Sequence, residues 1–104
     1  MNNNDKANLA VSILGKILYW KQTLGDSSLK TYVGIAEDPC HRLFHDHGVD
    51  RENGKYTFFD AISDDVARVV EQFLLCFGFI GGSGGGSDKT TSVYAYVITK
   101  STRQ

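Results

Sequence analysis

The stretch of sequence that decides the fold is LKTYVGIAEDPCHRLFHDHG, residues 29–48. Its first part, Leu29 to Ala36, is rich in β-branched and aromatic residues and predicts a strand. Asp38 can then cap a helix, and Pro39 suits the first position inside one. We expect that helix to continue to about His47, because the glycine that follows favours a helix end. The stretch therefore indicates a strand that leads directly into a short helix.

Upstream of this stretch, the segment from Lys6 to about Leu24 carries apolar residues at helical spacing. Gly25 and the polar residues after it indicate where this helix ends. The neighbouring aromatic residues Tyr19 and Trp20 leave a strand over residues 16–21 open as an alternative. The expected apolar stripe consists of Ile13, Ile17, Trp20 and Leu24, flanked by Val11, Leu14 and Leu18.

Downstream, residues 56–62 (YTFFDAI) predict a second strand, which follows a tight turn at Asn53-Gly54. Ser63 then caps a third helix, and the aspartates at positions 64 and 65 interact favourably with the dipole of its first turn. The face of this helix that we expect to be buried consists of Val66, Val69, Val70, Phe73, Leu74 and Phe77.

The C-terminal part contains a glycine-rich segment and one more strand. Residues 81–88 are expected to form a loop, because a run of glycine and serine favours neither helix nor strand. Residues 93–100 (VYAYVITK) predict the last strand, and residues 1–5 and 101–104 are expected to be flexible ends. We therefore expect a single α+β domain over residues 1–104, with a small, largely antiparallel three-stranded sheet flanked by about three helices.

Composition narrows the classes of function. The 104 residues include 11 basic and 12 acidic side chains, for a net charge of −1. This balance counts against tight, non-specific binding of nucleic acid, which depends on neutralising phosphates. No apolar run approaches the roughly 18 residues of a membrane span, and the start MNNND lacks the basic region of a signal peptide. We expect a cytoplasmic protein without membrane contact, in which Cys40 and Cys76 are free thiols.

A further pattern of residue types extends from the first predicted strand to the third helix. The strand carries Tyr32-Val33-Gly34-Ile35, Arg42 follows ten residues after the tyrosine, and His45 and His47 come next. After the second strand, the third helix carries an A-x-x-V-E pattern that ends at Glu71. In residue types, spacing and element order, this part of the chain resembles the core of the GIY-YIG nucleases.

The resemblance implies a metal-dependent endonuclease that hydrolyses nucleic-acid phosphodiesters. It implies that Glu71 binds Mg²⁺ or Mn²⁺, that Arg42 holds phosphate and that Tyr32 activates water. These residue types suit the roles, because a carboxylate binds hard cations and a guanidinium presents a fork of donors to phosphate. A histidine is implied to assist, four residues after the arginine. That position is occupied by Asp46, so the pattern leaves open whether His45 or His47 takes the role.

The first signature strand of the family, G-I-Y, has no clear counterpart upstream. The residues there, Ile17-Leu18-Tyr19-Trp20, have helical periodicity. Either Tyr19 lies on an atypical strand, or the first strand is missing, or the C-terminal strand takes its place. We favour the last interpretation, because Tyr94 and Tyr96 point to the same face of that strand and either could supply the second tyrosine. It predicts that the last strand lies beside residues 29–36, with one of these hydroxyl groups near Glu71.

Other interpretations of the same residues stay open. Arg42 can form an ion pair with Asp46 on an exposed helix face. His41 and His45 are spaced for a metal pair, but neither an H-E-x-x-H motif nor a suitable cysteine spacing accompanies them, so we do not expect zinc. The alternative to an enzyme is an inactive module of the same fold that binds nucleic acid or protein. For either function, a protein partner could supply the affinity for DNA.

Overall fold

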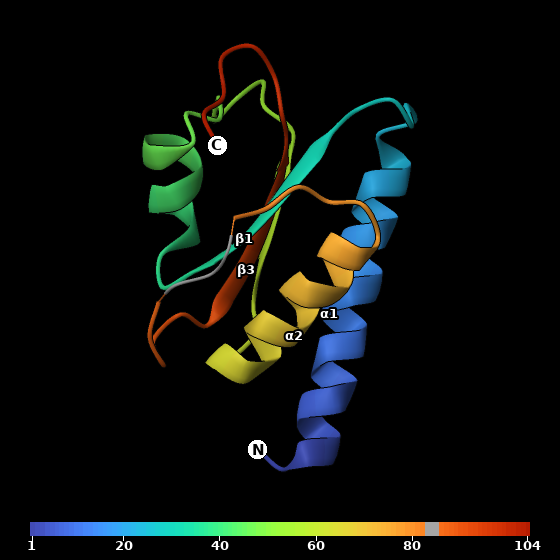
Figure 1. The fold of residues 1–104 in the computed structure, drawn as a ribbon, viewed down its shortest axis with the longest axis vertical. Coiled ribbons are helices and arrows are strands. Elements are labelled where there is room, and N and C mark those ends of the chain that lie inside the picture. The colour runs from blue at the N-terminus through green and yellow to red at the C-terminus, as the bar shows by residue number, and fades with distance from the viewer. Residues whose placement is uncertain (83–85) are drawn as a thin grey trace.

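Three strands and three helices make up the part of the chain that the computed structural model describes, residues 1–82 and 86–104 (Figure 1). The expected α+β class, with a three-stranded antiparallel sheet and about three helices, is confirmed. Residues 83–85 of the predicted glycine-rich loop lie outside the described residues. The elements are α1 (Asn3–Thr23), β1 (Thr31–Ala36), the π-helix η1 (His41–Asp46), β2 (Tyr56–Asp60), α2 (Asp64–Cys76) and β3 (Ser92–Val97).

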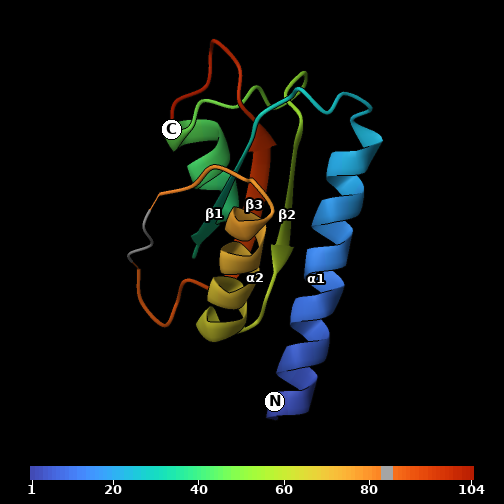
Figure 2. The ribbon, with the colours of Figure 1, turned by 45° about the vertical axis from the view of Figure 1, so that its right-hand side comes forward.

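The last strand of the chain occupies the centre of the sheet. The strand order is β1-β3-β2, and both pairings are antiparallel (Figure 2). Across the β1–β3 pair, Tyr96 lies opposite Tyr32 and Tyr94 lies opposite Gly34. The prediction that the C-terminal strand lies beside residues 29–36 is therefore confirmed. All six residues of β3 are buried, because helices cover the sheet on both faces.

Two apolar clusters lie on opposite faces of the sheet, as the alternation of side chains along each strand requires. On one face, Val33 of β1 and Val93 and Ala95 of β3 pack against α1 and α2. On the other face, the tyrosines of β1 and β3 pack around Leu43 of η1. Figure 1 shows this arrangement, with η1 in green on one side of the sheet and α1 and α2 on the other. The helices η1 and α2 can therefore meet only around the edge strand β1.

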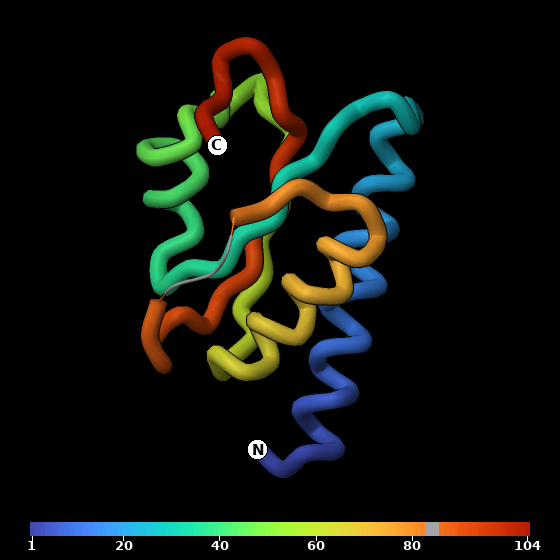
Figure 3. The backbone as a smooth tube through the Cα atoms, viewed as in Figure 1, coloured from blue at the N-terminus to red at the C-terminus, as the bar shows by residue number. Residues whose placement is uncertain are grey.

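Helix α1 begins three residues earlier than the expected Lys6. The side chain of Asn2 caps it by accepting a hydrogen bond of 2.8 Å from the backbone N–H of Asp5, so most of the expected flexible end is helical. The alternative strand over residues 16–21 is wrong, because α1 continues to Thr23. Its fully buried Ile17 packs in the cluster with α2, beside which α1 runs (Figure 3).

Helix α2 begins as expected, with the Ser63 side chain accepting a hydrogen bond of 3.4 Å from the N–H of Val66. Its buried face differs from the prediction. Val69, Phe73 and Phe77 are 44%, 52% and 57% exposed, whereas Ala67 and Glu71 are buried. The side that packs on the sheet is thus rotated towards Ala67 and Glu71, and Val69 and Phe73 line a shallow groove beside α1 instead. The small Ala67 allows this side of the helix to approach the sheet closely.

The C-terminal residues return to η1, although the sequence predicted a flexible end at 101–104. The backbone N–H of Arg103 donates to the carbonyl oxygen of His47 at 2.7 Å. Its guanidinium donates to the carbonyl oxygen of His45 at 2.9 Å. Among the described residues, no helix has the length and apolar character that crossing a membrane requires.

The packing of α1 on the sheet gives a stability prediction. We expect Ile17→Ala to lower the free energy of unfolding by about 2–5 kcal/mol, because it leaves a cavity at a fully buried position. Val11→Ala on the same helix is the matched control and should cost less than about 0.5 kcal/mol, because Val11 is 69% exposed. Urea denaturation of the three proteins measures both effects. Equal costs at the two positions would contradict the packing of α1 against the sheet.

Candidate active site

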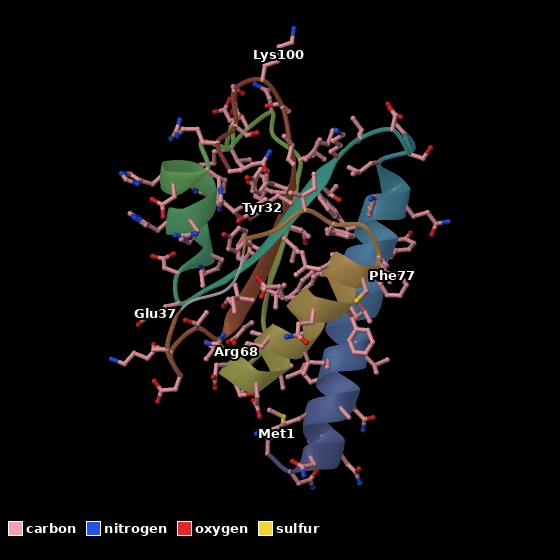
Figure 4. All side chains as sticks on the ribbon, viewed as in Figure 1. Met1, Tyr32, Glu37, Arg68, Phe77 and Lys100 are labelled. Atoms are coloured by element: carbon pink, nitrogen blue, oxygen red, sulfur yellow. The ribbon has the colours of Figure 1, made fainter. Side chains whose placement is uncertain are left out.

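A cleft of about 410 Å³ lies at the outer edge of β1, between η1 and α2. The predicted site residues that line it are Tyr32, Arg42, Glu71 and Tyr94. Four elements contribute one residue each, and the edge position of β1 lets side chains from both faces of the sheet reach the same space. In Figure 4, Tyr32 is labelled near the middle of the molecule, and Glu37, at the rim of the cleft, follows the end of β1. The structure thus brings together the phenol, guanidinium and carboxylate groups on which the sequence interpretation rests.

Tyr94 reaches the cleft by crossing β1 at Gly34. The two residues lie opposite each other in the β1–β3 pair. A Cβ atom added at Gly34 would collide with the ring and the hydroxyl group of Tyr94. The glycine in Tyr32-Val33-Gly34-Ile35 is therefore needed for space, since a side chain here would exclude the phenol from the cleft.

The π-turn of η1 decides which histidine faces inward. The backbone N–H of His47 donates to the carbonyl oxygen of Arg42, five residues earlier, at 2.8 Å. An α-helical turn would place Asp46, the fourth residue after the arginine, in that position. The extra residue in the turn therefore brings His47 one turn after Arg42 and buries it, with only 3% exposed. Of the two histidines that the sequence left open, His47 is therefore the one buried beside the tyrosines of β3.

His47 forms a hydrogen-bonded chain with the tyrosines of β3. Its Nδ1 lies 2.6 Å from the carbonyl oxygen of Arg103, which can only accept, so Nδ1 carries the proton. Nε2 then accepts a hydrogen bond of 2.7 Å from the Tyr94 hydroxyl. Burial lowers the pKa of His47, which keeps the imidazole neutral and Nε2 available as an acceptor. The hydroxyl of Tyr96 donates to the same carbonyl at 3.1 Å.

Arg42 is the cation at the mouth of the cleft. Its side chain is 46% exposed and forms an ion pair of 3.2 Å with Asp46, so the pairing considered from the sequence does occur. The adjacent Tyr94 hydroxyl raises the pKa of the Arg42 guanidinium. Burial raises the pKa of the Tyr94 phenol, and Arg42 partly opposes that shift. A guanidinium that borders both solvent and a buried phenol is well placed to hold an anion in the cleft.

Glu71 is a buried carboxylate in the wall of the cleft. It is only 7% exposed, and among residues 1–82 and 86–104 no hydrogen bond or ion pair to its oxygens is formed. Burial raises its pKa, and the charge of Arg68 offsets this only in part. A bound divalent cation would satisfy the carboxylate and favour its ionised form. The site therefore fits a hard cation such as Mg²⁺ or Mn²⁺, which binds through one carboxylate and keeps several waters.

Three predicted site residues, His45, His47 and Tyr96, do not line the cleft, and His47 reaches it only through its hydrogen bond to Tyr94. The ring of His45 lies outside it, 74% exposed, because η1 turns this side towards solvent. Tyr96 is fully buried behind Tyr94, where its hydroxyl bonds to the Arg103 carbonyl and lies 3.0 Å from His47 Nδ1.

The cleft also has lining residues that the sequence interpretation did not assign to a site. They are Glu37, Asp38, His41 and Thr90. Asp38 was predicted only as a helix cap, and its Oδ1 does accept a hydrogen bond of 3.1 Å from the N–H of His41. The position of these residues beside the edge of β1 depends on tertiary contacts, and no local pattern indicates it.

Comparison of the chain with models of protein families, with curated proteins and with solved structures finds no match. The side chains of the cleft are therefore the basis for inferring its chemistry.

The contact between Gly34 and Tyr94 gives the second prediction. We expect Gly34→Ala to lower the free energy of unfolding by about 1–3 kcal/mol or to shift Tyr94 out of the cleft, because the added methyl group overlaps the phenol. Gly15→Ala in α1 is the matched control: nothing lies within 4 Å of its added Cβ, and it should stabilise the helix by about 1 kcal/mol. Chemical denaturation measures the difference. A Gly34→Ala protein that is as stable as the parent and has unchanged tyrosine fluorescence would contradict the close contact between Tyr94 and Gly34.

The buried imidazole gives the third prediction. In the folded state the pKa of His47 lies below its ordinary value of 6.5, so the unfolded chain binds more protons in that window. Its contribution to stability is present above pH 6.5 and is lost as pH falls through the lowered pKa. Between pH 7 and pH 5 the parent should therefore lose more stability than His47→Gln, by up to about 1.4 kcal/mol per pH unit. Urea denaturation across this range measures the free energy of unfolding of both proteins. If it changed with pH in the same way in the two proteins, the lowered pKa of His47 would be contradicted.

Proposed function

We propose that this chain is a GIY-YIG-like endonuclease that hydrolyses phosphodiesters of nucleic acid with the help of Mg²⁺ or Mn²⁺. The observation that carries the proposal is the convergence of Tyr32, Tyr94, Arg42 and Glu71 on one cleft. Hydrolysis of a phosphodiester requires an activated water, stabilisation of charge on the phosphoryl oxygens and help for the leaving oxygen. The cleft offers a group suited to each requirement.

The two charged residues suit the binding of phosphate and metal. Arg42 would hold the phosphate through its planar guanidinium, half exposed at the mouth of the cleft. Glu71 would hold the divalent ion through its otherwise unpaired carboxylate. When bound, that ion would stabilise negative charge on the phosphoryl oxygens and polarise a water molecule.

Tyr94 is the best candidate for the proton acceptor. Its hydroxyl already donates a hydrogen bond to the neutral His47. When the phenol oxygen accepts a proton from the attacking water, its own proton can move to Nε2 of His47 in the same step. The enzyme would then need no free phenolate, which burial of Tyr94 disfavours. Tyr32, on the same wall of the cleft, would orient the water.

We also propose that a protein partner assists DNA binding and that the protein acts in the cytoplasm. The substrate is nucleic acid, but the net charge of −1 offers little long-range attraction for it. A protein partner would therefore supply part of the affinity for DNA. Cys40 and Cys76 are both free thiols, which suits the reducing cytoplasm as the place of action.

The second candidate is an inactive module that binds nucleic acid or protein through the same cleft. One observation favours it: the three acidic residues of the lining, Glu37, Asp38 and Glu71, outnumber its one arginine, Arg42. Such a cleft repels a phosphate backbone unless a cation is bound.

A plasmid-nicking assay with Mg²⁺ or Mn²⁺ tests the enzyme proposal. We expect the parent to convert supercoiled plasmid to the nicked form. Glu71→Gln should reduce the initial rate by about 100-fold or more, because it removes the charge that holds the metal while keeping the side-chain shape. Glu52→Gln, at an exposed position outside the cleft, is the matched control and should cleave like the parent.

The outcomes separate the two candidates. Equal products from the parent and Glu71→Gln would mean that a contaminant cuts the DNA, and would remove the enzyme proposal. No product from either protein, together with retention of labelled DNA or RNA in a filter-binding assay, would favour the inactive binding module.

A further inference from the structure

The solvent-facing side of η1 carries a compact group of two imidazoles and one carboxylate. One nitrogen from each of His41 and His45 and one oxygen of Asp46 lie within 4.8 Å of one another. His45 Nδ1 is 2.9 Å and His41 Nε2 is 3.7 Å from the same atom, Asp46 Oδ1. The two rings are stacked, with centroids 4.5 Å apart. The three ligand atoms therefore lie close together, although the stacked rings do not yet direct both nitrogens to one point.

The π-turn explains why three ligands rather than two gather here. In an α-helix, a residue lies over the one four positions earlier, which would pair His41 with His45 alone. In η1 the hydrogen bonds span five residues, as between His47 and Arg42. Asp46, five residues after His41, therefore lies over it together with His45.

Arg42 holds the carboxylate of this cluster in orientation. Its guanidinium bonds to Oδ2 of Asp46 at 3.2 Å and leaves Oδ1 turned towards the two histidines. Metal-binding carboxylates in proteins are commonly oriented in this way by a hydrogen-bonded neighbour. The carboxylate of the cluster is thus held by a neighbouring side chain.

The chemistry of the ligands indicates the class of ion. Imidazole nitrogens with one carboxylate suit late first-row divalent ions, of which Zn²⁺ is typical, whereas Mg²⁺ prefers oxygen ligands. Bonds of about 2.0–2.2 Å to zinc bring tetrahedral ligand atoms to about 3.4 Å from one another. The two separations from Asp46 Oδ1, 2.9 and 3.7 Å, lie close to that value. Rotation of the exposed His41 and His45 rings out of their stacked arrangement would direct both nitrogens to one ion.

The sequence shows no zinc motif and predicts no zinc site, but the π-turn adds Asp46 to the pair of histidines. We propose that His41, His45 and Asp46 form a binding site for a Zn²⁺-class ion on η1. His41 also lines the cleft, but all three ligands lie on η1, whereas Glu71 lies on α2. It leaves at least one coordination position open to water or to an external ligand. The proposal does not depend on nuclease activity.

Nuclear magnetic resonance of the histidine rings tests the site with Zn²⁺ alone as the probe. The chain has only three histidines, so their ring signals are easily followed. We expect titration with Zn²⁺, in excess Mg²⁺, to shift Nε2 of His41 and Nδ1 of His45 with a single equivalence point. The signals of His47 should stay in place, because both its nitrogens are occupied inside the protein.

Variants show whether Zn²⁺ binds at His41, His45 and Asp46 or elsewhere on the protein. His41→Ala should abolish saturable binding, and Arg42→Gln should weaken it by about tenfold, because it frees the carboxylate from its partner. Asp50→Asn, on an exposed aspartate outside the cluster, is the matched control and should bind like the parent. Glu71→Gln should also keep the binding, which separates this site from the proposed nuclease centre. Absence of ring shifts, or shifts that disappear with Glu71→Gln but persist in His41→Ala, would overturn the proposal.

Discussion

The arrangement on which the site depends is the insertion of β3 between β1 and β2. This strand comes last in the chain, yet it forms both ladders of the sheet and is buried along its whole length. Its register places Tyr94 opposite Gly34, where the absence of a side chain lets the phenol cross to the edge of β1. A shift by one residue would turn the tyrosines to the other face and bring Val93 or Ala95 to the cleft. The cleft chemistry therefore depends on strand register.

The π-turn of η1 is the second determinant, and it acts on both sides of the helix. On the inner side it brings His47 to Tyr94, with a hydrogen bond of 2.7 Å. On the outer side it gathers His41, His45 and Asp46. Arg42 lies between the two groups, since it borders Tyr94 in the cleft and bonds to Asp46 outside it. One extra residue in a helical turn thus sets the surroundings of all the ionisable groups of this helix.

Burial shifts the pKa of Glu71, which lines the cleft, and of His47, which lies behind Tyr94. Glu71 and His47 are both largely buried, and burial raises the pKa of the carboxyl group and lowers that of the imidazole. The imidazole is satisfied by its hydrogen bonds, whereas the carboxylate lacks a partner among the described residues. That difference is the physical reason for which we propose a cation at Glu71 and a proton-accepting role for His47.

The sequence by itself determined the elements and the residue types of the cleft. Periodicity and caps located both long helices, and the pattern from Tyr32 to Glu71 identified a phenol, a guanidinium and a carboxylate that line one space. Three features were decided only by tertiary structure: the central place of β3, the choice of His47 over His45, and the buried face of α2. Each depends on contacts between residues distant in the chain or on one added residue in a turn. Local propensity does not encode such contacts, because they form only when the sheet and its helices pack together.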